Sequence, residues 1–159
     1  MNKKIPRIYV DSSVVSGVFD HHLPERVEQA KRFWQSVVDG RIRIVASDVL
    51  EREVRDAPLY VQEFFDDLPE SQIEQVVSTD ESDNLAERYI AENVVGESSL
   101  NDCKHVALAT LAEADVLVSW NFKHIVRLNK IYRYNGINKM LGYREIEIRT
   151  PEEVPHDEN

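Results

Sequence analysis

Short apolar runs, rich in β-branched and aromatic residues, recur along the chain, and stretches with helical spacing separate them. Runs of this kind are typical of strands buried in a parallel sheet. They predict strands at "RIYV" (7–10), "RIRIVAS" (41–47), "QIEQVVS" (72–78) and "DVLVS" (115–119). A further run, "REIEIRT" (144–150), alternates as an edge strand does.

The intervening stretches repeat apolar residues at helical spacing and carry helix start and stop signals. Ser47 is placed to cap one helix, Gly40 to end another, and Pro58 to separate two more. Helices are predicted over 14–20, 24–39, 48–55, 59–66, 81–93 and 101–114. The last, "NDCKHVALATLAEA", is apolar on nearly all faces, so we expect it to be central and buried.

Strands that alternate with helices indicate an α/β domain whose mainly parallel sheet is covered on both faces. Right-handed crossovers then bring the carboxyl ends of the strands to one edge, where open α/β sheets bind ligands. We expect one domain over residues 1–150 and a polar tail over 151–159. Polar residues fall at or just past the predicted strand ends: Asp11, Ser12, Ser13, Ser47, Ser119 and Asn121.

The composition is that of a soluble globular protein. The chain of 159 residues has the length of one domain, with 42% apolar and 30% charged residues. No apolar run reaches the roughly 20 residues of a membrane helix, and the N-terminus lacks the apolar core of a secretory signal. We therefore expect a cytoplasmic protein with no membrane partner. The single cysteine, Cys103, excludes an internal disulfide, and the five scattered histidines do not supply a zinc site.

The charge of the chain is unevenly distributed. A formal net charge of −10 argues against nonspecific coating of nucleic acid, because that mode needs many cations. Residues 123–144, the basic stretch, nevertheless carry +6 with no acid, which leaves −16 elsewhere. Three tyrosines, Tyr132, Tyr134 and Tyr143, lie among these cations, a combination that suits a single-stranded nucleic acid. A solvated helix and loop with inward-packed tyrosines explains the same pattern.

Three acids stand out by their expected positions. Asp11 ends the first strand, Glu53 lies on the helix after Ser47, and Asp102 lies in the first turn of the buried helix. Considered singly, each acid has a structural explanation. Asp11 is placed to cap a helix, Glu53 to be a solvated charge, and Asp102 to interact with the positive end of its helix dipole. Together they would repel one another, and a hard dication would relieve that repulsion. Carboxylate-held Mg²⁺ prefers phosphate oxygens as further ligands, so the cluster points to phosphoester hydrolysis.

Four segments match a known pattern in order and spacing. They are "IYVDSSVV", "ASDVLEREV", "NDCKHVALATLAEADVLVSWNFKHIV" and "IEIRTPEEV", and they run from end to end of the chain. Through them the chain resembles PIN-domain proteins, of the kind found as VapC-type toxin ribonucleases in bacterial toxin–antitoxin pairs. The third segment is the longest and most specific. The resemblance implies a three-layer α/β/α sandwich and metal-dependent endoribonuclease activity.

The resemblance also assigns site residues. The acids of the family fall here, in order, on Asp11, Glu53 and Asp102. Glu51 is the less suitable choice for the second acid, and the hydroxyl that often accompanies the first maps to Ser12 or Ser13. The expected cofactor is Mg²⁺ or Mn²⁺. The expected partners are an RNA substrate, a small antitoxin protein and a second copy of the chain in a homodimer.

The chain departs from the family at a fourth acidic position, within "SWNFKHIV" (119–126). Members of the family place Asp either where this chain has Asn121 or three residues later, where it has His124. The amide oxygen of Asn121 can still bind Mg²⁺ or orient a water, but it contributes no charge. We therefore expect a greater metal requirement than with four acids. His124 is expected to contact a phosphate or to cap a helix.

The expected mechanism divides the work among these residues. Asp11 and Asp102 would hold one metal ion, while Glu53 would position the metal or its water. Asn121 would orient the nucleophile. The expected RNA contacts are Ser12, Ser13, Lys123, His124, Arg127 and Lys130.

Several neighbouring side chains are expected to have structural roles. Trp120 and Phe122 are interpreted as core and rim packing rather than base-stacking platforms, although the position of Trp120 at a strand end suits either role. Cys103 is interpreted as a packed helix residue, and His105 lacks the partners of a nucleophilic triad.

Two other functions stay open. A PIN-like module that lacks the fourth acid would bind RNA or protein with weak or no catalysis. A phosphoacceptor or phosphatase domain with Asp11 as nucleophile would need a second acid beside it or two residues after it. Ser12 and Ser13 occupy those places.

Overall fold

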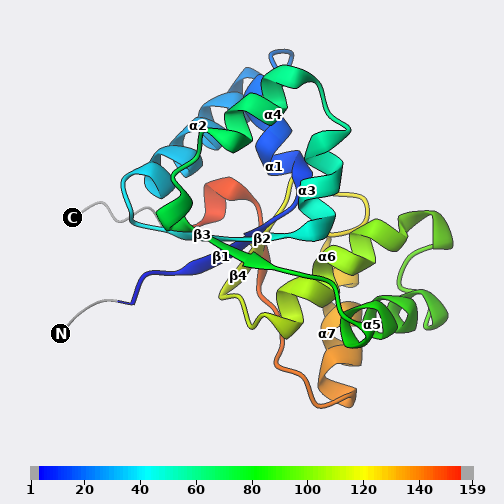
Figure 1. Ribbon diagram of the computed structural model, residues 1–159. Helices are drawn as coiled ribbons and strands as arrows, with labels where there is room; N and C mark the ends of the chain where they lie inside the picture. The colour runs from blue at the N-terminus through cyan, green and yellow to red at the C-terminus, as the bar shows by residue number, and fades with distance from the viewer. Residues whose placement is uncertain (1–3, 155–159) are drawn as a thin grey trace.

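The computed structural model describes residues 4–154, and within that range five strands form one parallel sheet (Figure 1). The strands are β1 Arg7–Val10, β2 Arg43–Ser47, β3 Ile73–Val76, β4 Val116–Val118 and β5 Ile148–Arg149. They lie in the order β3-β2-β1-β4-β5. Because the chain leaves β1 toward β2 and later returns to β4 on its other side, the topological switch point lies between β1 and β4.

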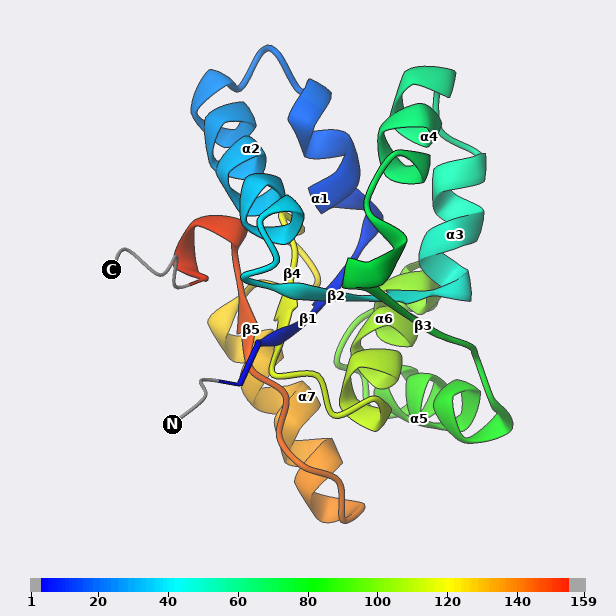
Figure 2. The ribbon, with the colours of Figure 1, turned by 60° about the vertical axis from the view of Figure 1, so that its left-hand side comes forward.

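Helices cover both faces of this sheet. They are α1 Ser12–Ser16, α2 Pro24–Val38, α3 Asp48–Arg55, α4 Leu59–Asp66, α5 Asp80–Ala91, α6 Leu100–Leu111 and α7 Leu128–Met140. Helices α1, α2 and α4 lie on one face, and α5, α6 and α7 lie on the other (Figures 1 and 2). Helix α3 follows the carboxyl end of β2 and contacts α1, α4 and α6. The chain therefore forms the predicted three-layer α/β/α sandwich.

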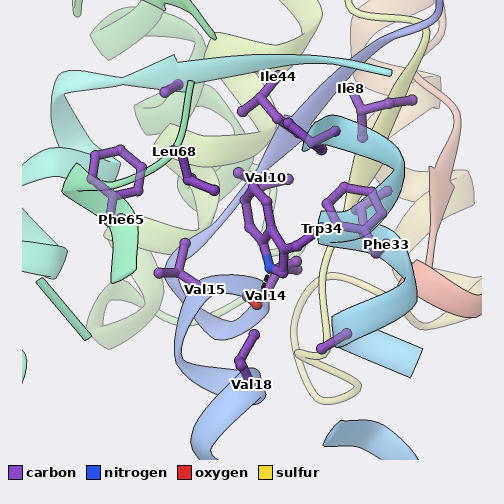
Figure 3. Close-up of a cluster of buried hydrophobic side chains, with 14 of the residues drawn as sticks. Ile8, Val10, Val14, Val15, Val18, Phe33, Trp34, Ile44, Phe65 and Leu68 are labelled. Carbon is purple, nitrogen blue, oxygen red and sulfur yellow. Dashed lines mark hydrogen bonds between the residues drawn. The ribbon is translucent and has the colours of Figure 1, made fainter. Parts of the chain in front are cut away.

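Two apolar layers hold the central strand from opposite sides. Ile8 and Val10 of β1 face the layer under α1, α2 and α4, whereas Tyr9 faces the layer under α5, α6 and α7. Figure 3 shows the first layer, where the Trp34 indole N–H donates to the Val14 carbonyl at 3.1 Å. Burying one large apolar side chain in such a layer stabilises the fold by roughly 1.5–3 kcal/mol. Tyr9 enters the second layer beside α6 because side chains alternate along the strand.

Local signals place several of these elements as predicted. The Leu50 backbone N–H donates to Ser47 Oγ at 3.1 Å, so Ser47 caps α3, an interaction typically worth about 1 kcal/mol. Helix α4 has the predicted bounds, 59–66. Helix α2 begins at Pro24, and Gly40 follows its end with a φ of +76°, a conformation that favours glycine.

Two segments differ from the predicted helices. The helix predicted over 14–20 begins at Ser12, because the Asp11 side chain accepts from the Ser13 N–H, and it continues as a 3₁₀ turn over Gly17–Phe19. Helix α7 fills the middle of the basic stretch, where no helix bounds were predicted and a helix and loop was one of two interpretations.

The boundary predicted at residue 150 needs correction. Residues Pro151–Glu153 form a 3₁₀ turn whose N-terminus is closed by a capping box from Thr150. Val154 is 3% exposed and packs in the first apolar layer, and the Gln29 side chain donates to Glu152 at 2.7 Å. The first four residues of the predicted polar tail therefore belong to the domain. The rest of that tail, 155–159, lies outside the described residues.

Candidate active site

Asp11 lies directly after β1 at the switch point and is 4% exposed. Its Oδ1 accepts from the Ser13 backbone N–H (3.1 Å) and hydroxyl (2.6 Å), and its Oδ2 accepts from the Ser119 hydroxyl (2.5 Å). Ser13 Oγ also accepts from the Trp120 N–H at 2.9 Å. Asp11 therefore caps α1, as its structural explanation required, and is also tied to the segment that follows β4.

Asp102 lies in the first turn of α6 and contacts the segment 119–126, which follows β4. The Asn121 side-chain Nδ2 donates to Asp102 Oδ1 at 3.2 Å. Asn121 Oδ1 points away from this contact and accepts from the backbone N–H groups of Lys123 (3.2 Å) and His124 (2.9 Å). The amide nitrogen, rather than the expected amide oxygen, thus faces the acid.

Glu53 lies on α3 and reaches across to α6. Its Oε1 accepts from His105 Nε2 at 2.6 Å, and the His105 side chain is 2% exposed against 27% for that of Glu53. Glu51 on the same helix pairs instead with Arg55, which also binds Asp66. The structure therefore places Glu53, and not Glu51, on the side of α3 that faces the other two acids.

The three acids interact electrostatically. Burial is the main cause that raises the pKa of Asp11 above its ordinary 3.8, and Glu53 adds to this while His105 and hydrogen-bond donors oppose it. Burial likewise raises the pKa of Asp102, with Asp11 and Glu53 adding to the effect and two histidines opposing it. We call Asp11, Glu53 and Asp102 the acidic corner. The negative charges of neighbouring acids thus make Asp11 and Asp102 easier to protonate.

Two carboxylates of the acidic corner, those of Asp11 and Asp102, are suitable ligands for Mg²⁺. Within residues 4–154, no group of three or more His, Cys, Asp or Glu side chains is arranged as a metal site. A carboxylate offers about four lone-pair positions. The hydrogen bonds above occupy three on Asp11 and one on Asp102, so both keep free positions. Mg²⁺ is commonly held by one or two carboxylates, with waters and substrate phosphates completing its shell.

The side chains predicted to contact RNA have different surroundings. Ser13 is committed to Asp11, and Lys130 Nζ donates to the Val94 carbonyl at 2.5 Å. Lys123 and Arg127 are exposed and have no side-chain partner among the residues that the structure describes. The remaining two, Ser12 and His124, are half-buried. Lys123 and Arg127 are therefore the best placed of the set to meet a phosphate.

The tyrosines of the basic stretch mostly follow the structural interpretation. Tyr134 is fully buried and its hydroxyl donates to the His124 carbonyl at 2.8 Å. Tyr143 is half-buried and donates to Glu81 at 2.6 Å. Tyr132 is 69% exposed. Only Tyr132 of the three is therefore free to stack on a base.

Two features beside the acidic corner were not predicted from the sequence. The Arg26 guanidinium of α2 lies over the rings of Trp120 (5.3 Å) and Phe122 (5.0 Å), and no local pattern links this arginine to residues so distant in the chain. The other feature is the link between Glu53 and His105. Asp102 and His105 are three residues apart on a helix and so share a face, a signal that was available.

Comparison with known structures agrees with this fold. The structure matches a chain from the crystal structure of VapBC2 from Rickettsia felis bound to a DNA fragment from their promoter, with a TM-score of 0.53 and 12% sequence identity. The match covers 91% of this chain and 98% of the other. No family model matches the chain, and no curated protein matches its sequence. At 12% identity the likeness concerns the fold, and it confirms the predicted PIN-like fold.

In the described part of the chain, no helix is both long enough and apolar enough to span a membrane.

Proposed function

We propose that the chain is a divalent-metal-dependent endoribonuclease that cleaves RNA phosphodiesters, and that it is the toxin of a toxin–antitoxin pair. The observation that supports the proposal is the acidic corner, where carboxylates from three separate elements interact electrostatically beside the switch point of the sheet. Burial raises the pKa values of Asp11 and Asp102, with repulsion from Glu53 adding to both and repulsion from Asp11 adding to that of Asp102. A bound dication would relieve that repulsion, and the PIN-like fold supports the same conclusion.

Each residue of the site has a role in the proposed reaction. Asp11 and Asp102 would hold Mg²⁺ or Mn²⁺, which when bound neutralises charge on the phosphate and lowers the pKa of a water. Ser119 keeps Asp11 in one orientation. Glu53 Oε2, which has no hydrogen-bond partner among the described residues, is available to accept a proton from the attacking water. Asn121 acts through its amide nitrogen, which orients Asp102.

The test is incubation of the purified protein with a single-stranded RNA in Mg²⁺, in Mn²⁺ and in excess chelator. We expect cleavage only with metal, and we expect Asp11→Asn to abolish it in a protein that still melts cooperatively. Glu51→Gln is a matched control, because it removes a carboxylate that pairs with Arg55 outside the acidic corner. Cleavage that persists in chelator would overturn the metal mechanism.

The contact between Asn121 and Asp102 favours a second candidate function. The neutral amide already supplies a hydrogen bond to the acid at the position where the family has a fourth carboxylate, so the fold needs no metal there. The chain would then be a PIN-like module that binds RNA or protein with weak or no catalysis. Two measurements separate the candidates: whether Mn²⁺ raises the melting temperature, and whether RNA is shortened in its presence.

The proposed antitoxin would inhibit the site directly. A bidentate Arg from a small partner would satisfy the paired carboxylates much as a metal does. We expect co-purification with the product of a neighbouring short reading frame, loss of cleavage, and protection of the Glu53 and Asp102 carboxyl groups from carbodiimide. A complex that left both cleavage and carboxyl reactivity intact would contradict this mode of inhibition.

A homodimer and a cytoplasmic location belong to the same proposal. The homodimer is proposed from the resemblance to toxin ribonucleases, and the location from the lack of a membrane-length apolar run and of a secretory-signal core in the sequence. Light scattering of the purified chain at several concentrations tests the first, and fractionation of cells that carry a tagged copy tests the second.

A further inference from the structure

A continuous line of hydrogen bonds runs through the interior to the acidic corner. The Leu50 N–H donates to Ser47 Oγ at 3.1 Å, and Ser47 Oγ lies 2.7 Å from the Tyr9 hydroxyl. The same hydroxyl lies 2.7 Å from His105 Nδ1, and His105 Nε2 lies 2.6 Å from Glu53 Oε1. The proposed reaction uses only the last of these residues.

The hydrogen-bonding chemistry of Glu53 determines which nitrogen of His105 carries the proton. An ionised carboxylate only accepts, so His105 Nε2 carries the proton that it donates to Glu53. His105 is 1% exposed, so its ring nitrogens depend on these protein partners. With the proton on Nε2, Nδ1 is placed to accept from the Tyr9 hydroxyl 2.7 Å away. Burial raises the pKa of Tyr9 well above its ordinary 10.0, so this hydroxyl stays protonated and able to donate.

A second buried tyrosine shows what a purely structural network looks like here. The Tyr89 hydroxyl donates to Asn138 Oδ1, Asn138 Nδ2 donates to Thr110 Oγ1 at 3.2 Å, and Thr110 Oγ1 donates to the Val106 carbonyl at 2.8 Å. All of these groups are buried and neutral, and the network ends on backbone inside the layer. The Tyr9 network instead ends on a carboxylate of the acidic corner.

We propose that His105, anchored by Tyr9, is a positioning residue that holds the Glu53 carboxylate toward Asp11 and Asp102. Both nitrogens of the His105 ring form hydrogen bonds, so the ring cannot rotate without breaking one of them. Glu53 lies on a helix surface and would otherwise sample several rotamers. This inference rests on the proposed function and assigns to two buried residues the task of keeping the third acid in place.

The experiment measures Mn²⁺ affinity from the electron paramagnetic resonance signal of the free ion. Tyr9→Phe should raise the Kd about 10-fold and His105→Leu by about 10- to 100-fold, the usual cost of losing an outer-shell partner. His105→Gln should recover part of this loss, because its amide N–H can still donate to Glu53. Tyr89→Phe is the matched control: Tyr9 and Tyr89 are both 0% exposed, and this control should leave the Kd unchanged.

The proposal is wrong if Tyr9→Phe binds Mn²⁺ as the native chain does, or if Tyr89→Phe weakens binding as much as Tyr9→Phe. It is also wrong if His105→Gln binds Mn²⁺ no better than His105→Leu. Thermal melts of all four variants show whether each is folded under the conditions of the titration.

A second readout separates this proposal from the proposed function. Nitrogen-15 spectra of the histidine rings report which nitrogen of His105 carries the proton without metal or RNA. We expect a protonated Nε2 whose signal moves in Glu53→Gln and in Tyr9→Phe but not in Tyr89→Phe. If the native chain neither binds Mn²⁺ nor cleaves RNA, the proposed function fails, and these spectra still decide whether His105 holds Glu53. An unprotonated Nε2, or one that ignores Glu53→Gln, would overturn the positioning role.

Discussion

The acidic corner and the basic stretch carry opposite charge and are built in opposite ways. The three acids come from β1, α3 and α6, far apart in the chain, and Asp11 and Asp102 have their pKa values raised chiefly by burial. The cations of the basic stretch all come from one continuous segment. Among the described residues, Lys123, Arg127 and Lys139 are exposed and have no side-chain partner.

This difference separates two kinds of contribution to function. In the acidic corner, the pKa values of Asp11 and Asp102 both depend on neighbouring charged side chains, so one substitution changes more than its own position. Charges in water are screened over about 8–10 Å at ordinary salt, so the exposed cations act nearly independently. The acidic corner should therefore determine whether chemistry occurs, and the basic stretch should adjust affinity in small steps.

The largest expected effect is the loss of cleavage on neutralising one acid. Asp102→Asn should reduce RNA cleavage by more than about 100-fold, since losing a direct ligand exceeds the 10- to 100-fold cost of losing an outer-shell partner. Lys123→Gln, also a single-charge change, should lower cleavage only a few-fold. Initial rates at saturating Mn²⁺ measure both. Similar losses in the two variants would break the distinction between the regions.

Asn121 lies between the acidic corner and the basic stretch, and its substitution should give the next largest effect, a change in Mn²⁺ affinity. In Asn121→Asp, one carboxylate oxygen can keep accepting from the Lys123 and His124 N–H groups, while the other adds charge beside Asp102. Mn²⁺ should bind roughly 10-fold more tightly or better, and the metal-free protein should melt at a lower temperature. Asn121→Ala should lose activity, because it removes both the turn acceptor and the donor to Asp102.

The same titration includes a comparison within this stretch. His124→Ala should change the metal requirement less than Asn121→Ala, because the His124 side chain is not among the ligands proposed here. If the native protein, Asn121→Asp and Asn121→Ala showed equal metal dependence, residues 119–126 would be only a loop.

The sequence predicted most of the fold because the signals for it are local. Ser47, Gly40 and Pro58 mark helix ends through their own backbone chemistry, and each apolar run needs only its own residues to be recognised. That Asp11 and Asp102 lie toward the same edge was predictable from topology, since parallel strands end at one edge and a helix that leads into the next parallel strand begins there. The choice of Glu53 over Glu51 rested on resemblance, and the structure supports it through the hydrogen bond with His105.

The remainder depends on interactions between distant residues. His105 lies 96 positions from Tyr9 and 52 from Glu53, so the sequence alone showed a histidine without partners. The orientation of the Asn121 amide depends on two backbone N–H groups in a turn that no pattern specifies. Val154 lies in a polar segment, and its burial follows from the route that the chain takes over the sheet.

A smaller effect concerns stability rather than cleavage. The pKa of Asp102 is raised from 3.8 in the folded chain, so its ionised form is disfavoured there. Its contribution to stability is full below the unfolded value and is lost as pH rises through the folded value. Asp102→Asn cannot ionise, so without metal it should melt about 2 °C or more above the native protein at neutral pH, with the difference closing in acid. Melts across pH with chelator measure this, and a lower melting temperature for Asp102→Asn at neutral pH would contradict it.

The smallest expected effect compares cations within the basic stretch. Lys130 and Arg133 donate to the Val94 and Glu92 carbonyls just after α5, whereas the exposed side chains of Lys123 and Arg127 form no hydrogen bond or ion pair with a described side chain. Replacing Lys123 and Arg127 by Gln should weaken RNA binding and reduce the log–log salt slope by up to about 1.4, or ~0.7 for each phosphate that is no longer neutralised.

Replacing Lys130 and Arg133 by Gln removes the same charge from the same basic stretch and is therefore the matched control. This pair should mainly lower the melting temperature, because cations near a helix C-terminus stabilise its free carbonyl groups. Binding titrations at several salt concentrations, beside thermal melts, separate the two outcomes. Equal slopes in the native protein and in the Lys123 and Arg127 variant would mean that the exposed cations do not meet phosphates. The basic stretch would then be a solvated helix and loop, and substrate affinity would have to come from the acidic corner through its metal.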